Sequence, residues 1–342
     1  MKIALVADDI DFNESEANPL NRQVDRIHRY YVEEITEGIR GAGYDVVLYR
    51  SPAELISNIH RHANDLVFPY WQGIHSKNRH ALNPAICEAA GVKYIGGDAF
   101  AKSLCNDKHM TKFLTRDLGL DAPLSVTLNT EADFHKMESL PLPLVIKPMF
   151  EGSSLGITQR NLVRDYASAA AMARELLLEF GGPIMAEEFV SGREVSICLI
   201  GYGDKIREWA AGERYVLKDE EFLKHNLYAF DDKYVAEDSL GMRNVKPEIW
   251  DGLFEACRRV FRYLDKVEYM RIDGKLAPNS FKIIELTPES HLGKNAEFCS
   301  TFLAEGKLGF SDVMAAVIEN CLERYSHCDE TGRLRMPASV RS

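Results

Sequence analysis

The chain has 342 residues and a formal net charge of −11, with 46% hydrophobic and 27% charged residues. This composition is typical of a globular protein of two or three domains, and the negative charge argues against a generic binder of nucleic acid or of an anionic membrane. No apolar run approaches the roughly 18 residues that a membrane span needs. Asp8 follows the first apolar residues too soon for a signal peptide, so we expect a cytoplasmic protein.

Seven cysteines are an odd number, and no two of them form a Cys-x-x-Cys pair. Most of them lie in apolar stretches, where a reduced thiol packs as a small hydrophobic group. We therefore expect neither disulfides nor a zinc site.

The first hundred residues alternate between predicted strands and helices. Short apolar strands are predicted at 2–7, 44–49, 65–69 and 92–96, and a helix at 24–42. Such alternation predicts a doubly wound parallel sheet. Ligands of these sheets bind beyond the carboxyl ends of the strands, which here means the loops after Ala7, Phe68 and Ile95.

A second unit is predicted to begin near residue 106. Its expected elements are a helix at 106–119, strands around Val145 and Ile184, a helix at 165–180, strands at 195–201 and 206–211, a helix at 247–264, a strand pair at 268–273 and 281–286, and a helix at 311–325. The polar stretch 218–246 is too long for a plain connection, so we interpret it as a lid over a site. The predicted units are 1–105, 106–194, 195–328 and a polar tail at 329–342.

Two segments of the second unit carry the chemistry. In residues 143–156 an apolar strand bears Lys147 and leads into a loop of glycines and serines, whose backbone N–H groups suit phosphate oxygens. In residues 271–287, Asp273 and Glu285 are expected on neighbouring strands, and carboxylate oxygens are ligands that magnesium prefers. Together the two segments predict a phosphoryl-transfer site.

Six motifs in a fixed order extend this prediction. They are the segments 106–112, 145–148, 151–156, 187–194 and 228–234, and Arg271-Ile-Asp273 followed by Glu285. As a set they resemble the ATP-grasp enzymes, and among these the D-alanine–D-alanine ligases most, over roughly residues 66–298. The resemblance implies an α/β ATP-grasp fold, in which an N-terminal doubly wound parallel-sheet domain precedes two α+β subdomains that clasp ATP.

The resemblance also implies a set of contacts to ATP. Lys112 and Lys147 match the two lysines that hold the phosphates, and Lys233 matches a lid lysine that reaches them once the loop closes. Glu194 matches the carboxylate that binds the ribose. The phosphate loop and the adenine hinge match Glu151, Gly152, Ser153 and Ser154, and Glu187, Glu188, Phe189 and Val190. Read singly, each lysine is a solvated surface charge and the two hinge glutamates are a solvated turn.

The metal site implied by the resemblance consists of Asp273, Glu285 and Thr287, and the expected cofactors are ATP with one or two Mg2+ ions, or Mn2+ in their place. The ligases have an asparagine where this chain has Thr287, and a hydroxyl is a weaker ligand. The second ion is therefore held more loosely, or it recruits Glu289 or a water molecule.

Catalytic roles follow from the same comparison. Arg271 matches the arginine that stabilises the oxyanion of the tetrahedral intermediate. Ser153 and Tyr234 match a pair that meets across the closed site and positions the first substrate, with Lys233 beside them. The alternative for Ser153 is that it only shapes its loop.

The side that receives the amine departs from the ligases. His291 stands where they have a glycine of the oxyanion hole, and it is either a contact to a new acceptor or a packed side chain. The pair that holds the second D-alanine aligns with Ala296 and Glu297. We therefore expect a rebuilt acceptor pocket, with Glu289 among its substrate contacts.

The N-terminal end departs as well. An acidic run at 8–16 replaces the opening that secures the amino group of the first substrate, and it either binds a cationic group or is solvated surface. Gln72 replaces a histidine. Arg79 or Lys77 can hold a substrate carboxylate, and the alternative for each is a surface charge.

These observations predict an ATP-dependent carboxylate–amine ligase that forms an amide or peptide bond through an acyl phosphate. Its substrates are expected to be a small carboxylate and a small amine, amino acids or similar molecules, in specialised biosynthesis, and its assembly a homodimer that contacts neither nucleic acid nor membrane. The nearer alternatives are a D-alanine–D-alanine ligase proper and an enzyme that closes a ring within one molecule. A different class is a nucleotide-binding sensor without turnover.

Overall fold

The computed structural model describes residues 1–8, 29–73, 76–229 and 240–327 of the chain. Most of the predicted acidic run at 8–16, the start of the predicted helix at 24–42 and the tail at 329–342 fall outside these ranges. Lys233 and Tyr234, predicted for the lid, also lie outside the described residues.

The N-terminal domain is built on three parallel strands in the order β2-β1-β3. Its elements are β1 (Lys2–Val6), α1 (Arg29–Gly41), β2 (Asp45–Tyr49), α2 (Pro52–Asn58), β3 (Leu66–Pro69) and α3 (Leu82–Ala90). The fourth predicted strand, at 92–96, is wrong: only a single parallel bridge joins Val67 to Tyr94. Gly96 ends this segment because its φ is +93° and its N–H is donated to the side chain of Glu268 instead of a strand.

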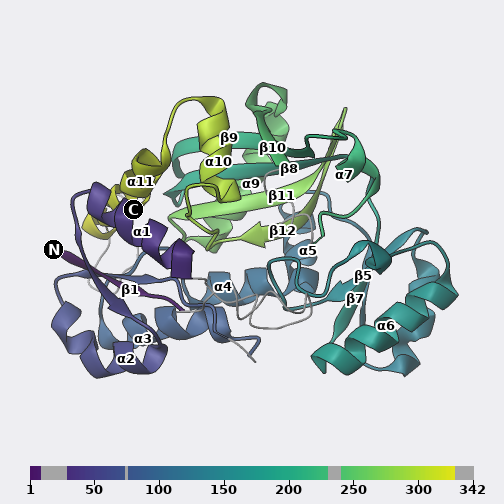
Figure 1. The fold of residues 1–342 in the computed structure, drawn as a ribbon, viewed down its shortest axis with the longest axis horizontal. Helices are drawn as coiled ribbons and strands as arrows, with labels where there is room; N and C mark the ends of the chain where they lie inside the picture. Colours follow the sequence, from purple (N-terminus) through teal and green to yellow (C-terminus); the bar gives the residue numbers. More distant parts are fainter. Residues whose placement is uncertain (9–28, 74–75, 230–239, 328–342) are drawn as a thin grey trace, which may run out of the picture.

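The central subdomain is a four-stranded sheet in the order β4-β7-β5-β6, with α6 against it (Figure 1). Its elements are α4 (Ala99–Asn106), α5 (Lys108–Asp117), β4 (Ser125–Leu128), β5 (Leu144–Pro148), β6 (Leu162–Val163), α6 (Tyr166–Phe180) and β7 (Ile184–Glu188). The predicted helix at 106–119 is α5, which begins after Asp107 because that carboxylate accepts the backbone N–H groups of His109 and Met110.

The C-terminal subdomain is a five-stranded antiparallel sheet in the order β10-β9-β8-β11-β12. Its elements are β8 (Arg193–Tyr202), β9 (Lys205–Val216), α7 (Phe222–His225), β10 (Leu240–Asn244), α9 (Asp251–Leu264), β11 (Tyr269–Ala277), β12 (Ser280–Thr287), α10 (Glu297–Glu305) and α11 (Phe310–His327). The stretch predicted as a lid contains α7 and the edge strand β10. The helix α10 was not predicted, and it packs against β8, β9 and β10.

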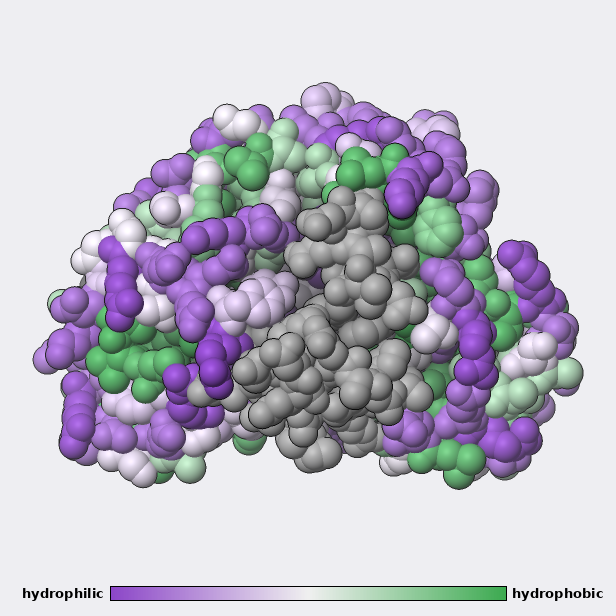
Figure 2. Space-filling model, in the orientation of Figure 1, coloured by the Kyte–Doolittle hydropathy of each residue, from purple (hydrophilic) through white to green (hydrophobic). Residues whose placement is uncertain are grey.

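Short 3₁₀ helices complete the connections at Ile59–His62, Arg79–Ala81, Glu131–Ser139, Gln159–Asn161 and Lys246–Glu248. Among the described residues, no helix has the length and apolar character needed to cross a membrane. Outside the region drawn in grey, Figure 2 shows mostly hydrophilic residues, with hydrophobic residues in small groups.

The first and last parts of the chain share one core. Ile3 and Leu5 of β1 lie in the same buried cluster as Val317 and Cys321 of α11. A buried carboxylate reinforces this junction, because Glu268 accepts one hydrogen bond from Arg324 of α11 at 2.5 Å and another from the backbone N–H of Gly96. The N-terminal domain is thereby fixed against the C-terminal sheet, and its loops face the site described below.

Replacing Arg324 by methionine should lower the free energy of unfolding by about 3–5 kcal/mol, because Glu268 is then buried without its counter-ion. Urea denaturation measures this loss. The matched control is Arg207→Met, which removes an exposed pair with Glu319 and should cost less than about 1 kcal/mol. Equal losses in the two variants would contradict the structural role of the buried pair.

Candidate active site

Asp273 of β11 and Glu285 of β12 stand opposite each other in the antiparallel register. The register shifts directly after Asp273, at Gly274, where a Cβ would lie 2.4 Å from the ring of Phe281 and 2.6 Å from a backbone oxygen. Only glycine fits this bulge, so it sets which residues of β12 face Asp273. The two carboxylates are the predicted metal ligands, and the fold brings them together.

The surroundings of Asp273 are short of positive charge. Burial and the neighbouring carboxylates Glu297 and Glu285 raise the pKa of Asp273 to about 6, although Arg271 opposes them through hydrogen bonds of 2.7 and 2.9 Å. The hydroxyl of Ser196 also donates to Asp273, at 2.7 Å. A divalent cation at this place would relieve the repulsion between the carboxylates.

Thr287, the third predicted metal ligand, follows Glu285 by two residues on β12 and so shares its face. Its hydroxyl oxygen is buried and has no hydrogen-bond partner among the described residues. In the same part of the chain no cluster of three or more Asp, Glu, His or Cys residues with metal-site geometry occurs. Two carboxylates and one free hydroxyl fit Mg2+, which is usually bound by few protein groups together with water and phosphate oxygens.

Lys112 and Lys147 meet at one carboxylate. The ammonium nitrogens of Lys112 from α5 and Lys147 from β5 lie 2.7 and 2.5 Å from the two oxygens of Glu187, and all three side chains are buried. Burial alone raises the pKa of Glu187, but the two lysines lower it to about 2, while burial lowers the pKa of Lys112 to about 8. Two cations share one anion, so the cluster keeps an excess positive charge that suits a phosphate chain.

The predicted phosphate loop connects β5 to the segment before α6. Ser153, Ser154 and Gly156 have left-handed φ values of +52°, +59° and +73°, and the N–H groups of Leu155 and Ile157 close two tight turns by donating to Gly152 and Ser154. Asn161 fixes the loop by donating to the backbone oxygens of Ile146 and Gly156, at 2.7 and 2.9 Å. The loop therefore has a fixed shape at the end of β5, and its binding of phosphate stays a prediction.

A narrow cleft of about 120 Å³ runs between the two sheets. Its walls include Lys147, the loop residues Glu151, Gly152, Ser153 and Ser154, the hinge residues Glu187, Glu188, Phe189 and Val190, and Glu194, Asp273 and Glu285. Glu194 is paired with Lys275 at 2.5 Å, and Glu188 with Lys282 at 2.6 Å. With the exception of Lys112, which lies behind Glu187, the described residues predicted for the nucleotide line one cleft.

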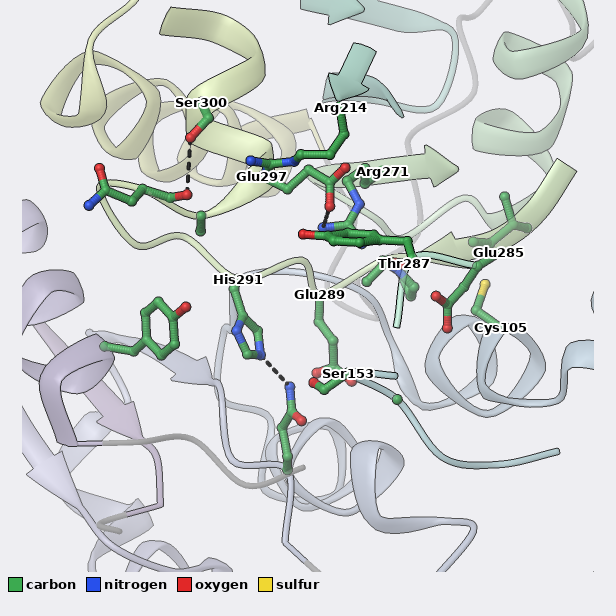
Figure 3. A pocket seen from close by; sticks show the side chains of 18 of the residues that line it. Cys105, Ser153, Arg214, Arg271, Glu285, Thr287, Glu289, His291, Glu297 and Ser300 are labelled. Atoms are coloured by element: carbon green, nitrogen blue, oxygen red, sulfur yellow. Dashed lines mark hydrogen bonds and ion pairs between the residues drawn. The ribbon is translucent and has the colours of Figure 1, made fainter. Parts of the chain in front are cut away.

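A larger cavity of about 720 Å³ adjoins the cleft. Ser153, Arg271 and Glu285 line both spaces, so they lie at the junction where a reaction between two ligands would occur. Arg271 also donates a hydrogen bond to the hydroxyl of Ser290, at 3.1 Å. Figure 3 shows Arg271 and Glu297 on one side of the cavity and His291 on the other.

Two predicted substrate residues that are 219 positions apart in the chain meet in this cavity. The amide nitrogen of Gln72 lies 3.0 Å from a ring nitrogen of His291 (Figure 3). The imidazole also packs edge-on to the ring of Tyr31 and near Tyr70, with centroids 5.2 and 5.8 Å apart. His291 is thus packed, as one alternative predicted, and it also lines the cavity. Its contact with an acceptor stays a prediction.

Residues 114–319 match the family model described as D-ala D-ala ligase C-terminus, which is more than half of the chain. The chain belongs to this family. It is accordingly an ATP-dependent ligase that forms C–N bonds, with ATP and Mg2+ as cofactors.

Individual relatives agree with the family. D-alanine–D-alanine ligase A of Escherichia coli K12 is 28% identical over 272 residues, 77% of this chain and 70% of the relative, and the enzyme of Salmonella typhimurium is 29% identical over 273 residues. The D-alanine–D-alanine ligase of Bacillus anthracis complexed with ATP superposes with a TM-score of 0.70 at 16% identity, covering 94% of this chain and 98% of that one. The VanG D-Ala:D-Ser ligase of Enterococcus faecalis gives 0.66 at 20% identity, over 94% and 99%. These structures confirm the ATP-grasp fold.

Within this ligase, Glu289 has partners that the sequence did not indicate. Its oxygens lie 2.6 Å from Lys102 and 2.6 Å from a ring nitrogen of His80. Burial raises the pKa of Glu289, but Lys102 and the contact with His80 lower it to about 2. Lys102 also donates to the backbone oxygen of Pro69, at 3.0 Å. Its charge is therefore balanced within the cavity wall, which argues against the recruitment of Glu289 as a magnesium ligand.

Arg79 is buried against the phosphate loop of this ligase. It donates to the backbone oxygen of Phe150 at 3.2 Å and to the carboxylate of Glu151 at 3.4 Å. It does not line either cavity among the described residues. In this geometry Arg79 supports the loop, and a substrate carboxylate would have to displace Glu151 to reach it.

Several site residues of the ligase were missed from the sequence. They are His80, Lys102, Lys108, Ser196, Arg214, Tyr228 and Glu297. Ser196 lies in an apolar strand, so it belonged to no recognisable motif. Glu297 had been aligned with the acceptor pair, but no role was predicted for its side chain, which opens an unpredicted helix. Two of the missed residues could have been found from the sequence. Lys108 and Tyr228 lie inside the motifs 106–112 and 228–234, in which other residues were assigned to the site.

Replacing Glu289 by glutamine should lower the free energy of unfolding by about 3 kcal/mol, because Lys102 then stays buried without a counter-ion. Glu285→Gln is the matched control, because Glu285 is 33% exposed, lies 3.7 Å from Lys108 in a long ion pair and repels Asp273. Its stability should stay within about 1 kcal/mol of the native value while Mg2+-dependent activity is lost. Denaturant titration and an ADP-release assay separate the two effects. An unchanged stability of Glu289→Gln would contradict the anchoring role.

Proposed function

We propose that this ligase joins a small carboxylate, an amino acid or a similar molecule, to an amine other than D-alanine, in specialised small-molecule biosynthesis. The observation that carries the proposal is the cavity of about 720 Å³, whose walls carry Glu289, His291 and Glu297. Each of these bears a polar or charged side chain at a place where the sequence departs from the related ligases. Because these residues of the cavity wall differ from those of the related ligases, the amine that the cavity binds should differ as well.

The proposed roles of the residues follow from their positions in the narrow cleft and the larger cavity. When bound, ATP with Mg2+ supplies a phosphoryl group that converts a substrate carboxylate into an acyl phosphate, which the amine then attacks. Lys147 and the loop around Ser153 hold the phosphates, and Asp273, Glu285 and Thr287 hold the metal. Arg271 stabilises the negative oxygen that develops during the attack.

Positioning contributes the rest. Ser153 and Arg271 border both spaces and so define where the two reactants meet. The predicted partners of Ser153 in the closed site, Lys233 and Tyr234, remain part of the proposal.

The proposal includes a homodimer in the cytoplasm. Phe100 and Phe113, each 55% exposed on the contacting helices α4 and α5, support an apolar contact between two copies. Light scattering of the purified protein at micromolar concentration would give the mass of the assembly.

The test of the function is ADP release with ATP and Mg2+ across D- and L-amino acids and simple amines, singly and in pairs, with mass spectrometry of active wells. A product lighter than its two substrates by one water is the expected result. If D-alanine were the only active substrate and gave the dipeptide, the chain would be a D-alanine–D-alanine ligase. A product formed from a single substrate molecule with loss of one water would establish ring closure. Nucleotide binding without ADP release from any well would favour a sensor.

Arg271→Lys keeps a cation but loses the planar fork that holds Asp273 and reaches Ser290. We expect kcat to fall by about 10²-fold while the KM for ATP changes little, because the arginine acts on charge that develops during reaction. Steady-state kinetics with the active pair of substrates measures both constants. A raised KM at constant kcat would assign Arg271 to ground-state binding instead.

A further inference from the structure

One cation in the larger cavity has no counter-ion among the described residues. Lys102 is neutralised by Glu289, and Arg271 by Asp273. Arg214 lines the same cavity and forms no ion pair within the described part of the chain. Its Nε is buried and has no hydrogen-bond acceptor there.

The strand register directs Arg214 toward the site. In β9, Gly212 lies opposite Ser196 of β8, whose hydroxyl reaches Asp273, and Arg214 follows Gly212 by two residues on the same face. The helix α10 covers this face, since a Cβ on Gly212 would lie 3.1 Å from Thr301. Figure 3 shows Arg214 above Glu297 at the edge of the cavity.

Nearby carboxylates are already engaged. Glu194, directly across from Arg214 on β8, is paired with Lys275 at 2.5 Å. Glu297 accepts a hydrogen bond from Ser196 at 2.9 Å and lies 3.7 Å from Arg271. Arg214 is partly exposed, but its buried Nε has no acceptor among the described residues. A buried donor without an acceptor is unfavourable by about 1–3 kcal/mol, and an anionic oxygen of a ligand would remove that penalty.

The ligand that Arg214 faces is not the nucleotide. Lys147 and the loop around Ser153 line the narrow cleft, whereas Arg214 lines only the larger cavity. Arg271 separates the two spaces, so a group bound at Arg214 lies beyond the reacting centre as seen from the nucleotide. Ala296 and Glu297, which align with the pair that holds the second D-alanine, line the same cavity, so this side fits the amine substrate.

We propose that Arg214 determines acceptor specificity by binding an anionic group, a carboxylate or a phosphate, of the amine substrate. This inference rests on the proposed ligase function. The planar guanidinium binds two oxygens of such a group at once, which fixes the orientation of the amine toward the activated carboxylate. Glu297, beside it, offers the negative charge that an ammonium group prefers.

The test compares acceptors in matched sets: an active amine with a free carboxylate, the same amine as its carboxamide, and its phosphonate analogue. With ATP and the acyl donor saturating, Arg214→Met should raise the KM for the anionic acceptor by about 10–100-fold, since a charge-assisted hydrogen bond is lost. The KM for the carboxamide should change by less than about threefold. Arg214→Lys should recover part of the affinity, and the phosphonate shows which anion the site prefers.

Arg207→Met is the control, because it removes an exposed arginine from the same strand, β9, far from either cavity lining. Its KM values should equal those of the native enzyme. If Arg214→Met raised the KM for the anionic and the neutral acceptor equally, or raised neither, the proposed role of Arg214 would be overturned. Neither result would contradict the ligase activity itself.

A second measurement does not depend on turnover. Thermal-shift titration with acetate and with inorganic phosphate, in the presence of saturating ADP and Mg2+, should stabilise the native protein more than Arg214→Met. Equal stabilisation would overturn the role of Arg214. Absence of ADP release with every acceptor would instead overturn the ligase proposal, so the two failures are distinguishable.

Discussion

The constraint on which the nucleotide side depends is the burial of Glu187 between two lysines. Burial of a carboxylate is unfavourable unless cations compensate it, and here Lys112 and Lys147 come from a helix and a strand that are 35 positions apart. The cluster therefore fixes α5 against the central sheet and leaves one positive charge in excess. The same contacts that hold the subdomain together prepare it for an anion.

The wall of the cleft opposite the lysines carries several carboxylates close together. Asp273, Glu285 and Glu297 lie together at the sheet β8-β11-β12. Arg271 pairs with Asp273 and Glu297, and Lys108 lies 3.7 Å from Glu285, yet burial and the neighbouring carboxylates raise the pKa of Asp273 to about 6. Under the proposed function, phosphates would meet Lys147 on one wall and a metal ion would meet the carboxylates on the other.

The shared cleft of the residues predicted for the nucleotide could be foreseen because local sequence places them on neighbouring elements. Lys147 is in an apolar strand followed by glycine and serine turns, and Asp273 and Glu285 flank a short hairpin, so spacing alone places them on neighbouring elements. The acceptor side could not be predicted in this way. The meeting of Gln72 with His291 depends on tertiary packing across 219 positions, for which no local pattern exists.

The same reasoning explains why Glu289 and Arg214 have opposite characters although both line one cavity. Glu289 obtains Lys102 and His80 from elements that the fold packs beside it, so its charge is balanced before any ligand arrives. Arg214 extends from β9 beneath α10, where the available carboxylates already bind Lys275, Ser196 and Arg271. Within the described part of the chain, Arg214 is thus the cation of this cavity that has no ion-pair partner. Under the proposed role of Arg214, an anionic group on the acceptor would balance this charge.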